Sequence, residues 1–282
     1  MGIVNVTPDS FADGGRYLDP ESAIAHGLEL IESGAAIVDV GGESTRPGHK
    51  PVLPIVELER VVPVVAGLAA AGVPISVDTT KASVAAASLD AGASIVNDVS
   101  ALRGDPEMAE LCGDRRAIVV LMHGYEIENR PTTSSSGDVM EAVKAFLVQR
   151  IEAAKDAGID ETRIWLDPGV GFGKVNPEGN LEVIRRLGEL QDLGMPIVVG
   201  TSRKSFIGRL DGSPPGERLG GTVASSLTAA LKGADVLRVH DVAAVAQALR
   251  ISAMTLNNTA ISPSHELEPA RDRDAGTKWV LS

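Results

Sequence analysis

The sequence lacks features that several classes of protein require. It contains one cysteine, Cys112, so no disulfide can form within the chain. No apolar run approaches the ~20 residues that a membrane-spanning helix needs, and no signal peptide precedes the first Val/Ile-rich segment. We therefore expect a protein of the reducing cytoplasm in which Cys112 is a small core residue, not a nucleophile.

Positive charge is also scarce. The chain has 26 lysines and arginines against 38 aspartates and glutamates, a formal net charge of −12. Because nucleic acids and anionic membranes bind net positive surfaces, this balance argues against both as partners. Any local cluster of basic residues therefore stands out.

Short Val/Ile-rich runs recur along the chain, and each is followed by a segment with helical periodicity. The expected strands are residues 3–6, 36–41, 75–78, 94–98, 117–122, 163–167, 196–200 and 236–240. The expected helices are residues 20–33, 53–70, 81–91, 105–111, 139–157, 179–193, 219–232 and 242–255. Eight such alternations predict an α/β fold, a single (β/α)₈ TIM barrel over residues 1–256. Residues 257–282 are polar and aperiodic, which predicts a disordered tail.

Each predicted strand is apolar until its C-terminal end, where polar residues appear, although a buried parallel strand is usually apolar throughout. The residues at these ends are Asn5, Thr45 with Arg46, Asp78, Asn97 with Asp98, Met122 with His123, Asp167, Ser202-Arg203-Lys204, and Arg238 with His240. A single Asp or Asn there could merely cap the next helix or bind loop backbone. Strand ends converge on one face of a barrel, however, so polar groups at all of them predict one site.

The acidic and amide members of this set suit a flat heterocycle. Asp78, Asn97 and Asp167 offer hydrogen-bond acceptors and one amide, which match an amino group and ring N–H donors such as a 2-amino-4-oxo edge. The two carboxylates could instead act as acid and base, but no third proton-relay group lies at nearby strand ends. Met122 and Phe172 are expected to exclude water from the ring, with ordinary packing as the alternative interpretation.

The basic members predict an anion site. The last two strands of such barrels commonly bind phosphate, so Arg238 and His240 are placed to bind an anion together with Arg46. Arg203 and Lys204 could each be a solvated surface charge, but their adjacency directly after "VVGTS" favours the site.

Seven motifs resemble the dihydropteroate synthase family, in order and at the expected strand ends: "GIVNVTPDSFADGG", "VDVGGESTRPG", "SVDTT", "IVNDVS", "LDPGVGFGK", "VGTSRKSFIG" and "LRVHDV". The likeness covers residues 2–256. It implies condensation of 6-hydroxymethyl-7,8-dihydropterin diphosphate with 4-aminobenzoate, release of pyrophosphate with Mg²⁺, and a homodimeric barrel.

The resemblance also implies roles for individual residues. Asn5 would ligate Mg²⁺ or the diphosphate, with Asp9 near the metal. The pterin would be bound by Asp78, Asn97, Asp167 and Lys204, and the diphosphate by Thr45, Arg46, Arg238 and His240, with Arg238 also stacking on the ring. The aminobenzoate would lie near Phe11, Pro47, Phe172, Ser202 and Lys204. The residues expected to act in catalysis are Asn5, Asp9, Arg46, Lys204, Arg238 and His240.

No Ser-His or Cys-His pair is arranged for covalent catalysis, so we expect positioning and charge stabilisation to carry a dissociative displacement. Two alternatives are a corrinoid methyltransferase domain, which shares the barrel and the pterin cradle, and a noncatalytic pterin-binding paralogue that acts as a partner subunit. A corrinoid methyltransferase domain would not require "TPDSF", "STRPG" and "SRKSF" together. A noncatalytic paralogue should have lost loop residues that are present here. Unlike family members with residues before the first strand, this sequence has Met1 directly beside it, so we expect a natural start upstream or a thinly covered barrel floor.

Overall fold

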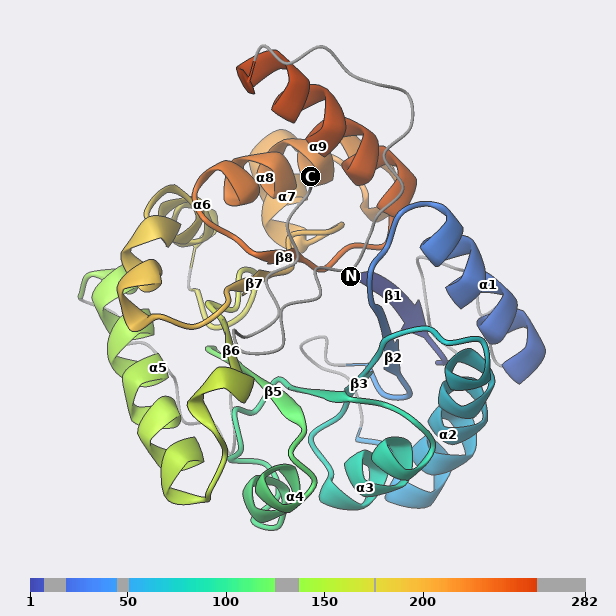
Figure 1. Ribbon diagram of the computed structural model, residues 1–282. Coiled ribbons are helices and arrows are strands. Elements are labelled where there is room, and N and C mark those ends of the chain that lie inside the picture. The colour runs from blue at the N-terminus through green and yellow to red at the C-terminus, as the bar shows by residue number, and fades with distance from the viewer. Residues whose placement is uncertain (8–18, 45–50, 125–136, 175, 258–282) are drawn as a thin grey trace.

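A computed structural model describes residues 1–7, 19–44, 51–124, 137–174 and 176–257. Over these ranges the strands are β1 (Gly2–Asn5), β2 (Val38–Gly41), β3 (Ile75–Asp78), β4 (Ile95–Asp98), β5 (Ile118–Met122), β6 (Ile164–Asp167), β7 (Val198–Val199) and β8 (Val236–Leu237). The helices are α1 (Pro20–Glu32), α2 (Pro54–Ala70), α3 (Ala82–Asp90), α4 (Met108–Asp114), α5 (Val139–Asp156), α6 (Pro177–Arg185), α7 (Ser205–Asp211), α8 (Leu219–Leu231) and α9 (Val242–Asn257). Short 3₁₀ helices are η1 (Glu161–Arg163), η2 (Leu187–Leu193) and η3 (Pro215–Glu217). The helices surround the strands as a ring (Figure 1).

The strands close into a barrel. β1 to β6 pair in parallel in sequence order, and β7 pairs in parallel with β8. Two parallel bridges, Leu166 with Ile197 and Gly2 with Val239, join these two sheets at both junctions. The Ile3 amide donates to the Val239 carbonyl at 3.1 Å, so the first strand is hydrogen-bonded to the last. The predicted single (β/α)₈ barrel is therefore confirmed.

Apolar side chains fill both sides of the strands. The larger cluster packs between the strands and the helices and includes Cys112, which is fully buried as predicted. A smaller cluster consists of Ile37, Ile95, Val120, Trp165 and Val198, with Met1 packed against it. Side chains alternate along a strand, so Ile95 and Trp165 share their faces with Asn97 and Asp167, two residues further on. This smaller cluster is therefore the apolar layer of the barrel interior beneath the polar strand ends.

Two helix starts follow from local sequence. The Asp19 carboxylate accepts from the Ser22 amide at 3.0 Å, and that of Asp138 accepts from the Met140 amide at 2.8 Å. Each aspartate therefore satisfies an amide that the first turn of its helix leaves without an intrahelical partner.

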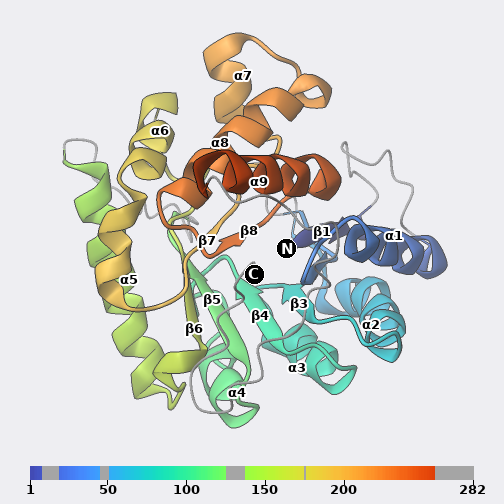
Figure 2. The same ribbon diagram turned by 45° about the horizontal axis from the view of Figure 1, so that its top comes forward.

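The sequence prediction is wrong in two places. The expected helix over residues 179–193 is divided into α6 and the 3₁₀ helix η2, because Arg186 leaves the helical conformation between them. A further helix, α7, follows β7 and lies beside α8 at the edge of the ring (Figure 2). Its seven residues make too few turns for an apolar stripe to recur, so periodicity gave no signal. Of the predicted tail, residues 258–282 lie outside the described part of the chain.

Candidate active site

Ten of the predicted site residues are described by the structure, and they fall into three groups at or just after the strand ends. Residues Asp9, Phe11, Thr45, Arg46 and Pro47 lie outside the described part of the chain, so their roles stay predictions. The remaining predicted residues are Asn5, Asp78, Asn97, Met122, Asp167, Phe172, Ser202, Lys204, Arg238 and His240, and the structure describes all of them.

The acceptor group lies on neighbouring strands. Asp78 is in register with Asn97, and Met122 is in register with Asp167. All four side chains are buried at the carboxyl ends of β3 to β6. Within the described residues, Asp78 Oδ1 is buried without a hydrogen-bond partner, which leaves it as an acceptor for a ligand.

Arg238 joins this group from the end of β8. Its Nη2 donates to Asp78 Oδ2 at 2.6 Å, and its Nε donates to Asp39 Oδ2 at 2.6 Å. Asn97 Nδ2 donates to the same Asp39 oxygen at 3.3 Å. Asp39 is therefore a buried anchor for both Arg238 and Asn97.

Sequence reasoning missed Asp39. It stands in the middle of β2, whereas our search was for polar residues at strand ends. A signal was present, because a charged residue inside an otherwise apolar parallel strand requires a buried partner.

Burial sets the electrostatics of this group. It raises the pKa of the Asp78 carboxyl to about 7, although Arg238 opposes the shift. Burial also disfavours the charged form of Arg238, but Asp39 and Asp78 together raise its pKa, so the guanidinium stays charged. The pKa of Asp167 is raised by burial against the opposing effect of Lys204.

A second group lies where β1, β7 and β8 end. His240 Nδ1 is 2.9 Å from Ser202 Oγ, and the His240 amide donates to the same hydroxyl at 3.1 Å. Asn5 Nδ2 lies 3.5 Å from His240 Nε2. The three predicted residues are thus brought together from opposite ends of the chain. The expectation that no serine is paired with a histidine is wrong here, because β7 and β8 are neighbours and bring Ser202 beside His240.

The third group is Lys204 with the loop after β6. Lys204 Nζ donates to the Val170 carbonyl at 2.6 Å and lies 4.1 Å from the centroid of the Phe172 ring. Burial lowers the pKa of Lys204 to about 8, and Asp167 opposes that shift. On the same loop, Asp167 Oδ1 accepts from the Gly169 amide at 2.7 Å.

Arg203 differs from its neighbour Lys204. Its guanidinium pairs with Asp241 through Nε at 2.9 Å and Nη2 at 2.5 Å. Asp241 therefore neutralises the Arg203 charge, which we had predicted to belong to the anion site. Arg203 instead ties the loop after β7 to the residue that follows His240.

Three other polar residues have structural partners. Asp98 accepts from the amides of Ser100 and Leu102, both at 2.8 Å, so it orders its own loop. Glu43 accepts from the Val52 amide and pairs with Lys81, which also pairs with the fully buried Glu57. His123 is buried, and its Nδ1 lies 3.1 Å from Lys174 Nζ.

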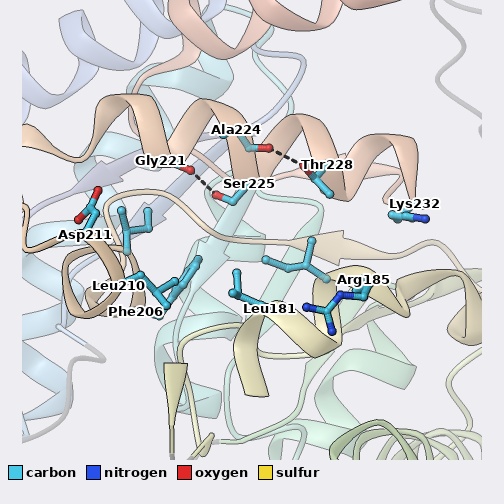
Figure 3. A pocket seen from close by; sticks show the side chains of 12 residues that line it. Leu181, Arg185, Phe206, Leu210, Asp211, Gly221, Ala224, Ser225, Thr228 and Lys232 are labelled. Atoms are coloured by element: carbon cyan, nitrogen blue, oxygen red, sulfur yellow. Dashed lines mark hydrogen bonds between the residues drawn. The ribbon is translucent and has the colours of Figure 1, made fainter. Parts of the chain in front are cut away.

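A separate groove of about 410 Å³ runs between α6, α7 and α8 on the outside of the barrel. Leu181, Phe206 and Leu210 point toward it, and its rim carries Arg185, Asp211 and Lys232 (Figure 3). None of the ten predicted site residues that the structure describes lines it. None of the described helices is both long and apolar enough to cross a bilayer.

Comparisons with known proteins agree with the geometry. The model of the pterin binding enzyme family matches residues 1–240. The chain is 48% identical to the dihydropteroate synthase of Mycobacterium leprae over 259 residues, which are 89% of this chain and 91% of that protein. The structure of the Xanthomonas albilineans dihydropteroate synthase with 4-aminobenzoic acid superposes with a TM-score of 0.84 at 47% identity, covering 92% of this chain and 93% of that one. For the Yersinia pestis enzyme in complex with a sulfonamide drug the TM-score is 0.86 at 41% identity, with 91% and 94% covered. Matched at this identity along most of its length, the chain belongs to the dihydropteroate synthase family of pterin-binding enzymes.

Proposed function

We propose that the strand-end groups bind 6-hydroxymethyl-7,8-dihydropterin diphosphate and 4-aminobenzoate and join them to give 7,8-dihydropteroate and pyrophosphate. The observation that carries this proposal is the buried carboxylate of Asp78, beside Asn97 and the cation Arg238, with one oxygen that has no hydrogen-bond partner among the described residues. An acceptor of this kind suits the amino and ring N–H donors of a pterin.

The pterin is held by Asp78, Asn97 and Asp167, with Lys204 bound at the loop after β6. Lys204 uses one donor on the Val170 carbonyl, so its ammonium keeps others for a ring acceptor. Met122 lies buried in register with Asp167 and shields the ring from water. Arg238 stacks on the ring and compensates the charges of the carboxylates around it.

The diphosphate is held by Asn5 and His240, together with Arg238 and the predicted Thr45 and Arg46. His240 and Ser202 are linked by two contacts, which fixes the imidazole close to the end of β1. The aminobenzoate lies near Ser202, Lys204 and Phe172, with the predicted Phe11 and Pro47.

Mg²⁺ fits Asn5 as a ligand. An amide oxygen is a hard donor of the kind that Mg²⁺ accepts, and the ion commonly binds through few protein groups with water and substrate phosphates. When bound, the ion would neutralise charge on the diphosphate, and Asn5 with the predicted Asp9 would hold it.

The reaction is a dissociative displacement. The bond between the methylene carbon and the diphosphate oxygen breaks first, and the oxygen leaves with the electron pair as pyrophosphate. The amine nitrogen of aminobenzoate then forms the new C–N bond and loses one proton to solvent. Arg238 and His240 favour this course because they stabilise charge on the departing group more than in the bound substrate.

The chain acts as a homodimer in the cytoplasm. The groove between α6, α7 and α8 supports a second copy as its occupant, since exposed Leu210 and Leu231 lie on its elements. Its basic Arg185 and Lys232 and its acidic Asp211 could pair across a two-fold axis. Sedimentation equilibrium tests the assembly, and a monomer at micromolar concentration would contradict it.

A coupled assay of pyrophosphate release tests the reaction. We expect release that requires both substrates and falls when Mg²⁺ is removed. Calorimetric binding of the pterin diphosphate without any release would favour the noncatalytic partner subunit. Positional isotope exchange in the diphosphate without aminobenzoate tests the order of steps, and an absence of scrambling would count against the dissociative course.

A further inference from the structure

Lys174 is a half-buried lysine at the end of the loop that follows β6, and the proposed reaction gives it no role. Its Nζ donates to the carbonyls of Pro168 at 2.6 Å and Gly169 at 2.7 Å, and lies 3.1 Å from His123 Nδ1. The side chain therefore folds back on the start of its own loop and reaches the end of β5.

These three acceptors match the three N–H donors of an ammonium group. Burial lowers the pKa of Lys174 to about 7, so the ammonium is the form present below that pH, and its third donor then lies toward His123 Nδ1 as the acceptor. His123 is itself held by an edge-to-face contact with Phe146, whose ring centroid lies 5.0 Å away. The Lys174 Nζ thus lies against three protein acceptors. By contrast, the Lys204 Nζ donates to one backbone carbonyl and lies over the face of the Phe172 ring.

The backbone that Lys174 holds is the part of the loop that meets the pterin groups. The Gly169 amide donates to Asp167 Oδ1, while the Gly169 carbonyl accepts from Lys174. One residue later, the Val170 carbonyl accepts from Lys204. A displacement of this backbone would therefore move the partners of both Asp167 and Lys204.

The packing leaves this backbone little freedom to compensate. A Cβ at Gly169 would lie 1.6 Å from the His123 carbonyl oxygen, so the loop sits directly against the end of β5. The backbone of Gly169 is also in the left-handed region, with φ of 65°. Lys174 and His123 bridge the two segments at this contact.

We propose that Lys174, with His123 as its third acceptor, is a positioning residue that fixes the loop over residues 168–173 for substrate binding. The inference rests on the proposed function, because it assumes that Asp167 and Lys204 bind the pterin. Lys174 itself touches no substrate.

The test compares Lys174→Met, which keeps an unbranched side chain as far as Cε but removes the ammonium donors, with Lys155→Met. Lys155 is an exposed lysine on α5 whose Nζ lies 3.7 Å from Glu161 Oε2, so it matches the chemical change away from the loop. The affinity for the pterin diphosphate is measured by calorimetry without aminobenzoate, and KM and kcat are measured by pyrophosphate release. We expect Lys174→Met to weaken pterin affinity by about tenfold or more and to raise the KM for the pterin diphosphate similarly, because the hydrogen bonds to the Pro168 and Gly169 carbonyls are lost, with Lys155→Met unchanged.

The His123 variants make the test independent of whether Lys174→Met folds. His123→Asn keeps an amide oxygen near the position of Nδ1, whereas His123→Leu has no acceptor. We expect His123→Leu to raise the pterin KM about fivefold or more and His123→Asn to restore most of the affinity.

A merely structural role would reduce the folded fraction, and therefore apparent kcat and melting temperature, while leaving KM unchanged. Unchanged KM and affinity in the folded Lys174→Met or His123→Leu protein would overturn the proposal. Wild-type protein that neither binds the pterin nor releases pyrophosphate would instead refute the proposed function, so the two failures are distinguishable.

Discussion

Replacement of Asp78 by Asn tests the core of the proposed pterin site. In the described structure Asp78 Oδ2 binds Arg238 Nη2 at 2.6 Å, and Oδ1 is left without a partner. Asp78→Asn keeps the shape but replaces a charged acceptor with a neutral amide, which cannot accept at both positions. Hydrogen bonds to charged groups contribute about 1.5–3 kcal/mol, so we expect a loss of about 2 kcal/mol, or about 30-fold in Kd.

Isothermal titration calorimetry with the pterin diphosphate measures this loss. The matched control is Asp90→Asn, because Asp90 is an exposed aspartate at the end of α3 that pairs with Arg115. Burial raises the pKa of Asp78 to about 7, so wild-type affinity should fall as the pH drops below 7 and the carboxylate is protonated. The Asp78→Asn protein should show a weaker dependence over this range. An affinity within twofold of wild type would refute the assignment of Asp78 to the pterin.

Three further predictions concern buried charges. Arg238→Ala should raise the KM for the pterin diphosphate, and it should lower the free energy of unfolding by about 3–5 kcal/mol in urea because Asp39 is left buried and unpaired. An unchanged KM would count against its role at the diphosphate. Lys81→Met should cost a similar 3–5 kcal/mol in urea, since the fully buried Glu57 loses its cation, and a cost below about 1 kcal/mol would contradict this. Burial lowers the pKa of Lys174 from 10.5 to about 7, so the unfolded chain binds more protons between these values and this residue makes stability rise with pH from 7 to 10. Urea midpoints across that range should rise less in Lys174→Met, and equal slopes would exclude the effect.

The barrel and most of the strand-end residues follow from sequence because two independent patterns coincide. The first pattern is a mostly apolar strand that ends in a polar residue, and it can be recognised within a single strand, as in "ISVD" and "IWLD". The alternation of such runs with helical segments then specifies where the ends meet. Asp78 and Asp167 could be predicted for this reason, although they are far apart in the chain.

Other parts of the site depend on partners that sequence proximity does not indicate. Asp39 binds Arg238, which is 199 residues away, and nothing in the local pattern of β2 links the two. Arg203 and Lys204 are adjacent cations, yet Arg203 has a positive φ of 56° and its side chain pairs with Asp241. Lys204 is directed to the loop after β6 instead. The sequence therefore predicted one shared role for Arg203 and Lys204, whereas in the folded protein the two side chains have different partners.

A crystal structure of the protein with 6-hydroxymethylpterin and pyrophosphate tests the central claim most directly. The account predicts the amino and ring N–H edge of the pterin within hydrogen-bond distance of Asp78 Oδ1 and Asp167, with pyrophosphate against His240 and Arg238. A pterin bound elsewhere, for example in the groove between α6, α7 and α8, with the strand-end carboxylates untouched, would contradict it.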